Sequence, residues 1–299
     1  MTDLRRAVRE ATAVLVGAGI ESASADAVAL AAHVLRVEPA EVRRLLVLGG
    51  RAVPESYAAL VHDRARRVPL QHLTGQAHFR RLTLSVGPGV FVPRPETEVL
   101  VGLALEEVDR LERGDRPRGA GGGCGARDGI RLVDLCSGSG AIPLAVKEER
   151  PAVRVRGIEL SPEALAWGTR NRDVLGLDVE LVQGDATRPC FHDWRGTVDV
   201  VTVNPPYIPV GAVPLDPEVR DHDPELALYG GSEDGLAIPL AVATVAAELL
   251  RPGGLVLMEH AEAQGDSLPR ALAAAGPWTD VADHADLAGR PRVAAARRR

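Results

Sequence analysis

Asn-Pro-Pro-Tyr, from Asn204 to Tyr207, follows an apolar segment that reads as a buried strand. A turn after a strand needs only one Pro or Gly, so the two prolines call for a further explanation. The Asn204 side-chain oxygen and the Pro205 carbonyl could each accept one N–H of a planar NH2 group, and the prolines fix φ and hold both acceptors in place. Two fixed acceptors would orient this poorly nucleophilic nitrogen and stabilise the positive charge that develops on it. Tyr207 offers an aromatic face to a flat or cationic group. The predicted catalytic residues, which would also contact the substrate, are Asn204, Pro205, Pro206 and Tyr207.

Polar residues also recur where successive apolar segments end. The predicted strands stop at, or run to, Asp134, Glu159, Asp185 and Asn204. In a mainly parallel sheet these ends converge on one edge, where ligands bind. For a single acidic residue a solvated loop carboxylate is the simpler interpretation. Recurrence at successive strand ends favours a ligand site.

The segment Cys-Ser-Gly-Ser-Gly (136–140) follows the first of these strands, and its glycines let the backbone approach a ligand. It contains only part of the GxGxxG pattern of dinucleotide-binding loops. An acidic residue about 20 residues further on commonly binds ribose hydroxyls, which suits Glu159; Asp134 could accept from an ammonium group, and Asp185 stands near the expected adenine pocket. A ligand with an amine, a ribose and an adenine but no phosphate fits S-adenosylmethionine better than NAD. The predicted cofactor-binding residues are Asp134, Cys136, Ser137, Gly138, Ser139, Gly140, Glu159, Asp185 and Asn204.

Three regions would position these residues. Residues 1–70 read as a bundle of short amphipathic helices without catalytic motifs, so their functional interpretation is partner docking. Residues 71–97 read as a linking β-hairpin, in which RLTLSV is one strand, GPG is the turn and VFV begins the second strand. Residues 98–299 form the expected catalytic domain, interrupted by a Gly-rich surface insertion (112–129) that contains Cys124.

The catalytic domain is predicted to be an α/β fold. A helix is expected over residues 97–112, and from residue 130 apolar strands alternate with helices. Such alternation is typical of a mainly parallel sheet covered by helices on both faces. The five predicted strands are IRLVDL, VRVRGIE, VELVQ, VDVVTV and GGLVLME.

Composition restricts the classes of function. The 299-residue chain has a net charge of −6, which argues mildly against a broad face for duplex nucleic acid. Its three cysteines lack CxxC spacing, so we expect no metal site or disulfide framework, and a reducing compartment. The N-terminal segment lacks the apolar region of a signal peptide, and no apolar run approaches the ~20 residues that span a bilayer. We therefore expect a soluble, cytoplasmic protein without a membrane partner.

Three segments together resemble the release factor glutamine methyltransferases of the PrmC/HemK family: residues 72–101, the Asn-Pro-Pro-Tyr sequence, and EHAEAQGD (259–266). PRPETE (93–98) is the most specific of these motifs. The resemblance covers essentially the whole chain. It implies an N-terminal helical domain followed by a Rossmann-like class I S-adenosylmethionine-dependent methyltransferase domain. It also implies methylation of the side-chain amide of the glutamine in the Gly-Gly-Gln motif of peptide chain release factors. Phe91 and Arg94 lie in the segment that is close to the active site in the family, and are predicted to contact the substrate.

The chain departs from the family pattern at three positions. Cys136 stands where a Gly is usual, Glu159 where an Asp is common, and Ala186 cannot supply the aromatic side chain that the family can place at the adenine. A small side chain and a longer carboxylate are both compatible with the same cofactor.

Two other functions remain open. An adenine methyltransferase of the Asn-Pro-Pro-Tyr type, acting on DNA or RNA, would extrude its base and usually carries a basic surface, whereas this chain is acidic and has PRPETE. No stable nucleic-acid partner is therefore expected. A binding protein that has lost catalysis would not need an intact Asn-Pro-Pro-Tyr.

Overall fold

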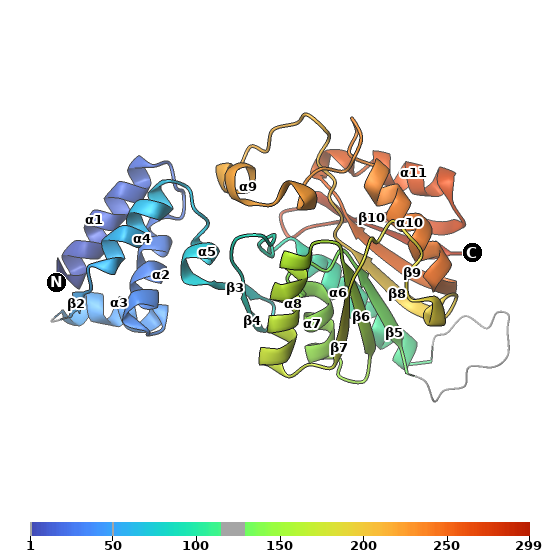
Figure 1. The fold of residues 1–299 in the computed structure, drawn as a ribbon, viewed down its shortest axis with the longest axis horizontal. Helices are drawn as coiled ribbons and strands as arrows, with labels where there is room; N and C mark the ends of the chain where they lie inside the picture. Colours follow the sequence, from blue (N-terminus) through green and yellow to red (C-terminus); the bar gives the residue numbers. More distant parts are fainter. Residues whose placement is uncertain (1, 50, 115–128) are drawn as a thin grey trace. The chain divides into compact units, whose positions relative to one another are not determined.

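The structure is a computed structural model that describes residues 2–49, 51–114 and 129–299 (Figure 1). Most of the predicted Gly-rich insertion, and Cys124 with it, lies outside these residues. The chain divides into two compact units. The first comprises Met1–Gln76, Val86–Pro88 and Pro214–His222, and the second comprises Ala77–Ser85, Gly89–Val213 and Asp223–Arg299.

The first unit is helical. Its helices are α1 (Leu4–Gly17), α2 (Ala23–Leu35), α3 (Pro39–Leu48), α4 (Ser56–Ala65), α5 (Leu70–Thr74) and α9 (Pro217–His222). A short antiparallel pair, β1 (Thr2–Asp3) and β2 (Ala52–Val53), joins the start of the chain to the segment between α3 and α4. The apolar faces of the helices meet in one core, which includes Leu4, Leu15, Leu30, Val42 and Tyr57.

A buried ion network holds α9 in this unit. Glu218 of α9 accepts from Arg64 Nη1 at 2.7 Å and from Arg67 Nη2 at 2.6 Å, although these arginines precede it by about 150 residues. Arg64 also donates through Nε to Asp26 Oδ2 at 2.7 Å. The Arg64 side chain is only 7% exposed. Its charge is therefore compensated by two carboxylates that the fold brings together, since an unpaired buried charge would be costly.

The second unit is built on a seven-stranded sheet with the strand order β10-β11-β9-β8-β5-β6-β7. Its strands are β5 (Arg131–Leu135), β6 (Arg154–Glu159), β7 (Val179–Gln183), β8 (Val198–Val203), β9 (Leu250–Glu259), β10 (Trp278–Ala285) and β11 (Pro291–Arg298). Strands β5 to β9 pair in parallel, and β10 and β11 are antiparallel. The strand order reverses at β5, between β6 and β8, which is the position where α/β sheets bind ligands.

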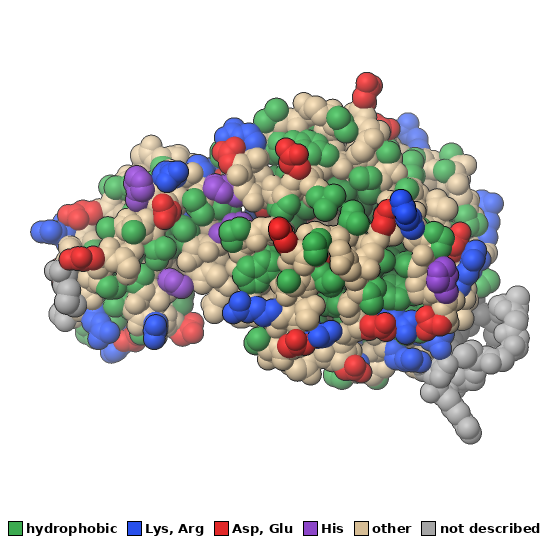
Figure 2. All heavy atoms as spheres, in the orientation of Figure 1, with side chains coloured by type: hydrophobic (Ala, Val, Ile, Leu, Met, Phe, Trp, Pro, Cys, Tyr) green, Lys and Arg blue, Asp and Glu red, His purple; other side chains and the backbone are tan. Residues whose placement is uncertain are grey.

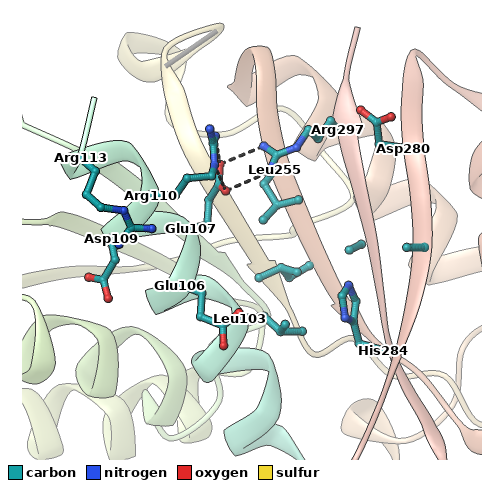
Figure 3. Close-up of a pocket in the computed structure, with 13 residues that line it drawn as sticks. Leu103, Glu106, Glu107, Asp109, Arg110, Arg113, Leu255, Asp280, His284 and Arg297 are labelled. Atoms are coloured by element: carbon teal, nitrogen blue, oxygen red, sulfur yellow. Dashed lines mark hydrogen bonds and ion pairs between the residues drawn. The ribbon is translucent and has the colours of Figure 1, made fainter. Parts of the chain in front are cut away.

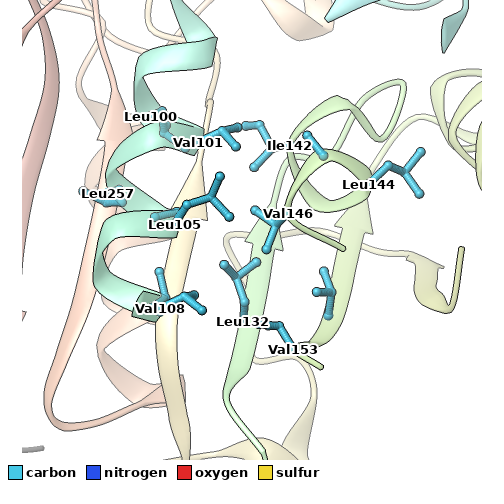
Figure 4. Packing of buried hydrophobic residues seen from close by; sticks show 14 of the residues in the cluster. Leu100, Val101, Leu105, Val108, Leu132, Ile142, Leu144, Val146, Val153 and Leu257 are labelled. Carbon is cyan, nitrogen blue, oxygen red and sulfur yellow. The ribbon is translucent and has the colours of Figure 1, made fainter. Parts of the chain in front are cut away.

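Helices cover both faces of this sheet, as the sequence predicted. The helices α6 (Thr97–Glu112), α7 (Ala141–Glu149) and α8 (Pro162–Leu175) pack on one face, and α10 (Ala237–Leu249) and α11 (Ser267–Ala275) pack on the other. Adjacent strand residues point to opposite faces, so Leu132 faces α6 and α7 whereas Val133 faces the core under α10. Figure 4 shows Leu105 and Val108 of α6 pointing toward the sheet beside Val146 of α7.

The predicted hairpin is wrong in its pairing. Residues 90–92 form no strand; instead β4 (Leu82–Ser85) pairs with the preceding β3 (Gln76–Phe79). The turn falls at Arg80, which has a φ of +50°. Its backbone N–H donates to Glu98 Oε1 and its guanidinium to Glu149 Oε2, both at 3.0 Å. These partners are remote in sequence, so the local Gly-Pro-Gly signal was a poor guide to the turn.

The C-terminal strands β10 and β11 and the helix α11 were not predicted. The segment of β11 contains a run of three alanines, which have low β-propensity, and β10 is rich in polar residues as an edge strand can be. Among the described residues, no helix is long and apolar enough to cross a membrane.

Stability should depend on pH through Glu218. Burial raises the pKa of this carboxyl, but hydrogen bonds with Asp216, Arg64 and Arg67 outweigh burial and bring the pKa to about 2. Because the folded pKa lies below the unfolded value, the stabilisation is present above about pH 5 and is lost as the pH falls toward 2. Urea titrations should show Glu218→Gln less stable than wild type by about 1–2 kcal/mol at pH 7, with a smaller difference at pH 3.

The matched control is Glu21→Gln, an exposed glutamate of the same unit, which should leave the free energy of unfolding unchanged at both pH values. A Glu218→Gln effect that is equal at pH 7 and pH 3 would contradict the assignment.

Candidate active site

The parallel pairing of β5 places Asp134 between the ends of β6 and β8. Its side chain is fully buried, and Oδ1 accepts from the Thr202 hydroxyl of β8 at 2.7 Å. Oδ2 is buried without a hydrogen-bond partner among the described residues. Burial raises the pKa of Asp134 to about 7, against hydrogen bonds from Thr202 and Ser137. A buried acceptor without a partner is costly and calls for a functional explanation.

The loop 136–140 turns tightly between β5 and α7. The backbone N–H groups of Cys136 and Ser137 both donate to the Ile158 carbonyl of β6, at 3.1 and 3.0 Å. At Gly140, φ is +81°, and a Cβ there would lie 2.9 Å from Leu144 Cδ1. Both the positive φ and the short distance to the buried Leu144 side chain therefore favour Gly at position 140.

Glu159, at the end of β6, binds this loop directly. Its Oε2 accepts from the Gly138 N–H at 2.7 Å and its Oε1 from the Ser161 N–H at 2.8 Å. Burial raises the pKa of Glu159, and these backbone hydrogen bonds act in the opposite direction. Each carboxylate oxygen has a further lone pair, so Glu159 can still accept hydroxyl groups.

Asp185 follows β7 and completes a set of three acidic residues around the loop. Burial and the charges of Glu159, Asp134 and Asp185 all raise the pKa of the Cys136 thiol. Asp185 itself accepts from the Thr187 N–H and hydroxyl, which lower its pKa. Its predicted place beside the adenine is not tested by these contacts and stays a prediction.

The Asn-Pro-Pro-Tyr segment follows β8 at the same edge of the sheet. Pro205 and Pro206 are buried, whereas Asn204 and Tyr207 are half-buried. Asn204 Nδ2 donates to Thr97 Oγ1 at 3.3 Å. The segment is therefore joined to the first residue of α6, which belongs to PRPETE.

Tyr207 is anchored through its hydroxyl and its backbone. The hydroxyl donates to Glu259 Oε1 at 3.4 Å, and the Tyr207 carbonyl accepts from Gln264 Nε2 at 2.9 Å. Burial raises the pKa of this hydroxyl, with Arg94 and Arg292 among the groups that act in the opposite direction. Tyr207 is therefore a protonated hydrogen-bond donor at neutral pH.

Phe91 and Arg94 lie in contact with each other, the guanidinium carbon 5.1 Å from the ring centroid. Arg94 Nη2 also donates to the buried Asp223 at 2.8 Å. The charge of Arg94 acts to lower the pKa of the Tyr207 hydroxyl. The Phe91–Arg94 pair therefore lies near the Asn-Pro-Pro-Tyr segment.

A separate pocket of about 510 Å³ lies between the C-terminal half of α6 and the strands β9 to β11 (Figure 3). Glu107 in its wall accepts from Arg110 and Arg297 at 2.7–2.9 Å. These hydrogen bonds outweigh burial and lower the pKa of Glu107 to about 2. The residues that line this pocket include none of the predicted site residues, so we interpret its charges as a structural network.

Comparison with known proteins identifies the family. The PrmC N-terminal domain matches residues 6–75, and the Methyltransferase small domain matches residues 126–214. The release factor glutamine methyltransferase of Streptomyces coelicolor is 45% identical over 297 residues, which cover 97% of this chain and 96% of that protein. This chain belongs to the release factor glutamine methyltransferase family. The member from Mycolicibacterium smegmatis is 43% identical over 100% of this chain and 99% of its own length.

A relative with a different name is nearly as similar. The 4-amino-L-phenylalanine/4-methylamino-L-phenylalanine methyltransferase of Streptomyces pristinaespiralis is 40% identical, over 92% of this chain and 89% of that protein. With the sheet order, the family membership confirms the predicted fold: the second unit is a Rossmann-like class I S-adenosylmethionine-dependent methyltransferase domain.

Sequence reasoning missed several polar residues of this methyltransferase site. Asn171 of α8 is 2% exposed and donates to the carbonyls of Ser139 and Ser85, at 2.9 and 3.0 Å. It thereby ties the loop 136–140 to β4, and nothing in its charged sequence surroundings indicates this. Thr97 and Glu259 were within motifs that carried the family resemblance, but had no role assigned.

Cys136 provides a test of the loop geometry. Its φ is +69°, a conformation that L residues other than Asn and Asp rarely adopt, which explains the usual Gly of the family. In urea titrations we expect Cys136→Gly to stay within about 1 kcal/mol of wild type, because relief of strain offsets the more flexible unfolded chain. Cys136→Val should cost at least ~2 kcal/mol, because a β-branched residue fits a positive φ poorly.

The control is Cys190→Val, at a half-buried cysteine that is not among the residues with positive φ. It should cost less than Cys136→Val. Equal stability of Cys136→Gly and Cys136→Val would show that φ is not the determinant.

Proposed function

We infer that this enzyme transfers the methyl group of S-adenosylmethionine to the side-chain amide nitrogen of the glutamine in the Gly-Gly-Gln motif of peptide chain release factors. One observation carries the inference: Asn204 of the reaction motif is hydrogen-bonded to Thr97 of PRPETE. The chemistry for a planar nitrogen and the family-specific segment thus share one site. The full-length similarity to enzymes named for this reaction supports the same substrate.

The residues at the sheet edge fit the cofactor. The unpartnered Oδ2 of Asp134 can accept from its ammonium group, and the Glu159 carboxylate can accept from its ribose hydroxyls. A Cβ at Gly138 would project into open space, so Gly at this position leaves the loop backbone accessible to the cofactor. When bound, S-adenosylmethionine supplies a methyl group on a positively charged sulfur.

The protein's own residues orient the acceptor nitrogen. The lone pair of an amide nitrogen is delocalised, so the reaction needs positioning and charge stabilisation. Asn204 Oδ1 and the Pro205 carbonyl each accept one N–H of the glutamine amide, and the buried prolines hold both oxygens in place. Tyr207, protonated and anchored by Glu259, provides a flat surface for the amide. Phe91 and Arg94 border the same place.

We propose that the helical unit, predicted over residues 1–70, docks the release factor. A specific transient complex usually buries at least ~1,000 Å² in total, more than a Gly-Gly-Gln loop offers. Binding energy gained away from the glutamine can hold it in line for transfer. The match of residues 6–75 to the PrmC N-terminal domain supports a family-specific role. Because release factors work in translation, we place the enzyme in the cytoplasm.

Nucleic acid is a poorer substrate for this surface. The net charge is −6, and Figure 2 shows basic and acidic side chains interspersed over the described residues of the face that it draws. Base-extruding enzymes usually need a basic surface. We therefore propose no stable nucleic-acid partner.

Asn204→Ala should abolish most methyl transfer and should largely retain cofactor binding, because the other eight predicted cofactor-binding residues are unchanged. Removing one positioned hydrogen-bonding group of this kind typically costs ~10²–10³ in rate. The measurement is transfer of a tritiated methyl group to purified release factor, with cofactor affinity measured by calorimetry. A near wild-type rate would remove Asn204 from the reaction.

The same assay tests the substrate class. DNA, RNA and 4-amino-L-phenylalanine should accept no methyl group, and a short Gly-Gly-Gln peptide should be a much poorer substrate than intact release factor. Efficient methylation of the peptide would contradict docking by the helical unit, and efficient methylation of DNA or RNA would favour the adenine methyltransferase.

Glu159→Ala should weaken cofactor binding by roughly 10- to 100-fold, because a hydrogen bond to a charged group contributes about 1.5–3 kcal/mol. Glu159→Gln, which keeps the side-chain shape but not the charge, should weaken binding less. Calorimetry that finds an unchanged affinity for Glu159→Ala would exclude the ribose contact.

A further inference from the structure

A buried polar pair backs the Asn-Pro-Pro-Tyr segment. Thr97 and Glu259 are 3% and 2% exposed, whereas their partners Asn204 and Tyr207 are half-buried. Asn204 Nδ2 donates to Thr97 Oγ1, and the Tyr207 hydroxyl donates to Glu259 Oε1. Asn204 and Tyr207, which would face the substrate, are thus each hydrogen-bonded to one member of the buried pair.

The two contacts have defined directions. The Thr97 hydroxyl oxygen has two lone pairs and accepts from Asn204 Nδ2 at 3.3 Å. Glu259 Oε1 accepts from the Tyr207 hydroxyl at 3.4 Å. Burial is the main cause that raises the pKa of Glu259 to about 7.

This direction of hydrogen bonding decides the orientation of the Asn204 amide. The two ends of an asparagine amide have nearly the same shape, so only the partners distinguish a donor end from an acceptor end. If the amide were rotated by half a turn, Oδ1 would face Thr97 and would no longer face the substrate. Nδ2 would then point its donors at the N–H groups of the substrate amide.

Glu259 is held in a costly state. Its Oε2 is buried and has no hydrogen-bond partner among the described residues. The charged groups that act on it are Arg292, which lowers its pKa, and Glu96, which raises it. A buried carboxyl oxygen without a hydrogen-bond partner is rare in folded proteins and calls for an explanation.

We propose that Thr97 and Glu259 are positioning residues: Thr97 fixes the Asn204 amide with Nδ2 turned to Thr97 and Oδ1 free to accept from the substrate nitrogen, and Glu259 fixes Tyr207 beside it. The proposal rests on the proposed function, because this orientation matters only for a substrate that presents N–H groups. Thr97 is the threonine of PRPETE, so the proposal assigns a role in the reaction to one residue of this motif.

The test compares Thr97→Val, which has nearly the same shape without the hydroxyl, with Thr97→Ser, which keeps the hydroxyl. On release factor, Thr97→Val should lower kcat by ~10- to 100-fold, as expected when an acceptor is misoriented near the reaction. Its KM for release factor and its cofactor affinity should stay at the wild-type values. Thr97→Ser should recover most of the lost kcat. Thr244→Val, on the exposed side of α10, is the matched control and should behave as wild type.

A double-mutant cycle separates positioning from general stability. In the Asn204→Ala background there is no amide to orient, so Thr97→Val should cause no further loss of kcat. A full further loss, or an unchanged kcat for Thr97→Val alone, would overturn the proposal while leaving the proposed function intact. Absence of methyl transfer by the wild-type enzyme would overturn both.

Glu259→Gln provides a second variant that does not depend on the folding of Thr97→Val. It replaces one of the two acceptor oxygens with an amide group of similar shape. It should also lower kcat with unchanged cofactor affinity, and a wild-type kcat would overturn the part of the proposal that concerns Glu259.

Discussion

The parallel hydrogen bonding of β5 to both β6 and β8 is the constraint on which the site depends. In this register Asp134 lies opposite Gly157 on one side and Thr202 on the other. Both neighbouring strands therefore end at the same edge as β5, and the Glu159 and Asn204 side chains are delivered there from opposite sides. A shift of one residue in either pairing would turn every side chain of that strand to the other face, and the carboxylate cluster around the loop 136–140 would be lost.

Much of this site could be predicted because it follows from strand ends and loops. The positions of Asp134, Glu159 and Asn204 need only the recognition of apolar strands and the rule that parallel strands end together. The antiparallel β10 and β11 could not be found in the same way, because their packing and not their residue types makes them strands. The prediction of the hairpin was wrong for a related reason. Its turn is set by hydrogen bonds from Arg80 to Glu98 and Glu149, which are remote in sequence.

The buried polar residues show most clearly what cannot be predicted from the sequence. Asn171 holds the loop 136–140 and β4 together from the middle of a helix, and no local pattern distinguishes it from a solvated asparagine. Relatives of almost equal similarity are named for a release factor and for a free amino acid. The shared scaffold alone therefore does not identify the substrate, which has to be inferred from the residues of the site.

The position of α9 has a consequence for how this enzyme can be divided. The first unit is assembled from three stretches of chain, and the last of them follows shortly after the Asn-Pro-Pro-Tyr segment of the second unit. Cutting the polypeptide once would leave Arg64 with Asp26 but without Glu218, and Glu218 without its arginines. The helical unit is therefore not a detachable module. A chimera that exchanges it between relatives would have to transplant all three stretches, so that Arg64 and Arg67 keep Glu218 as their partner.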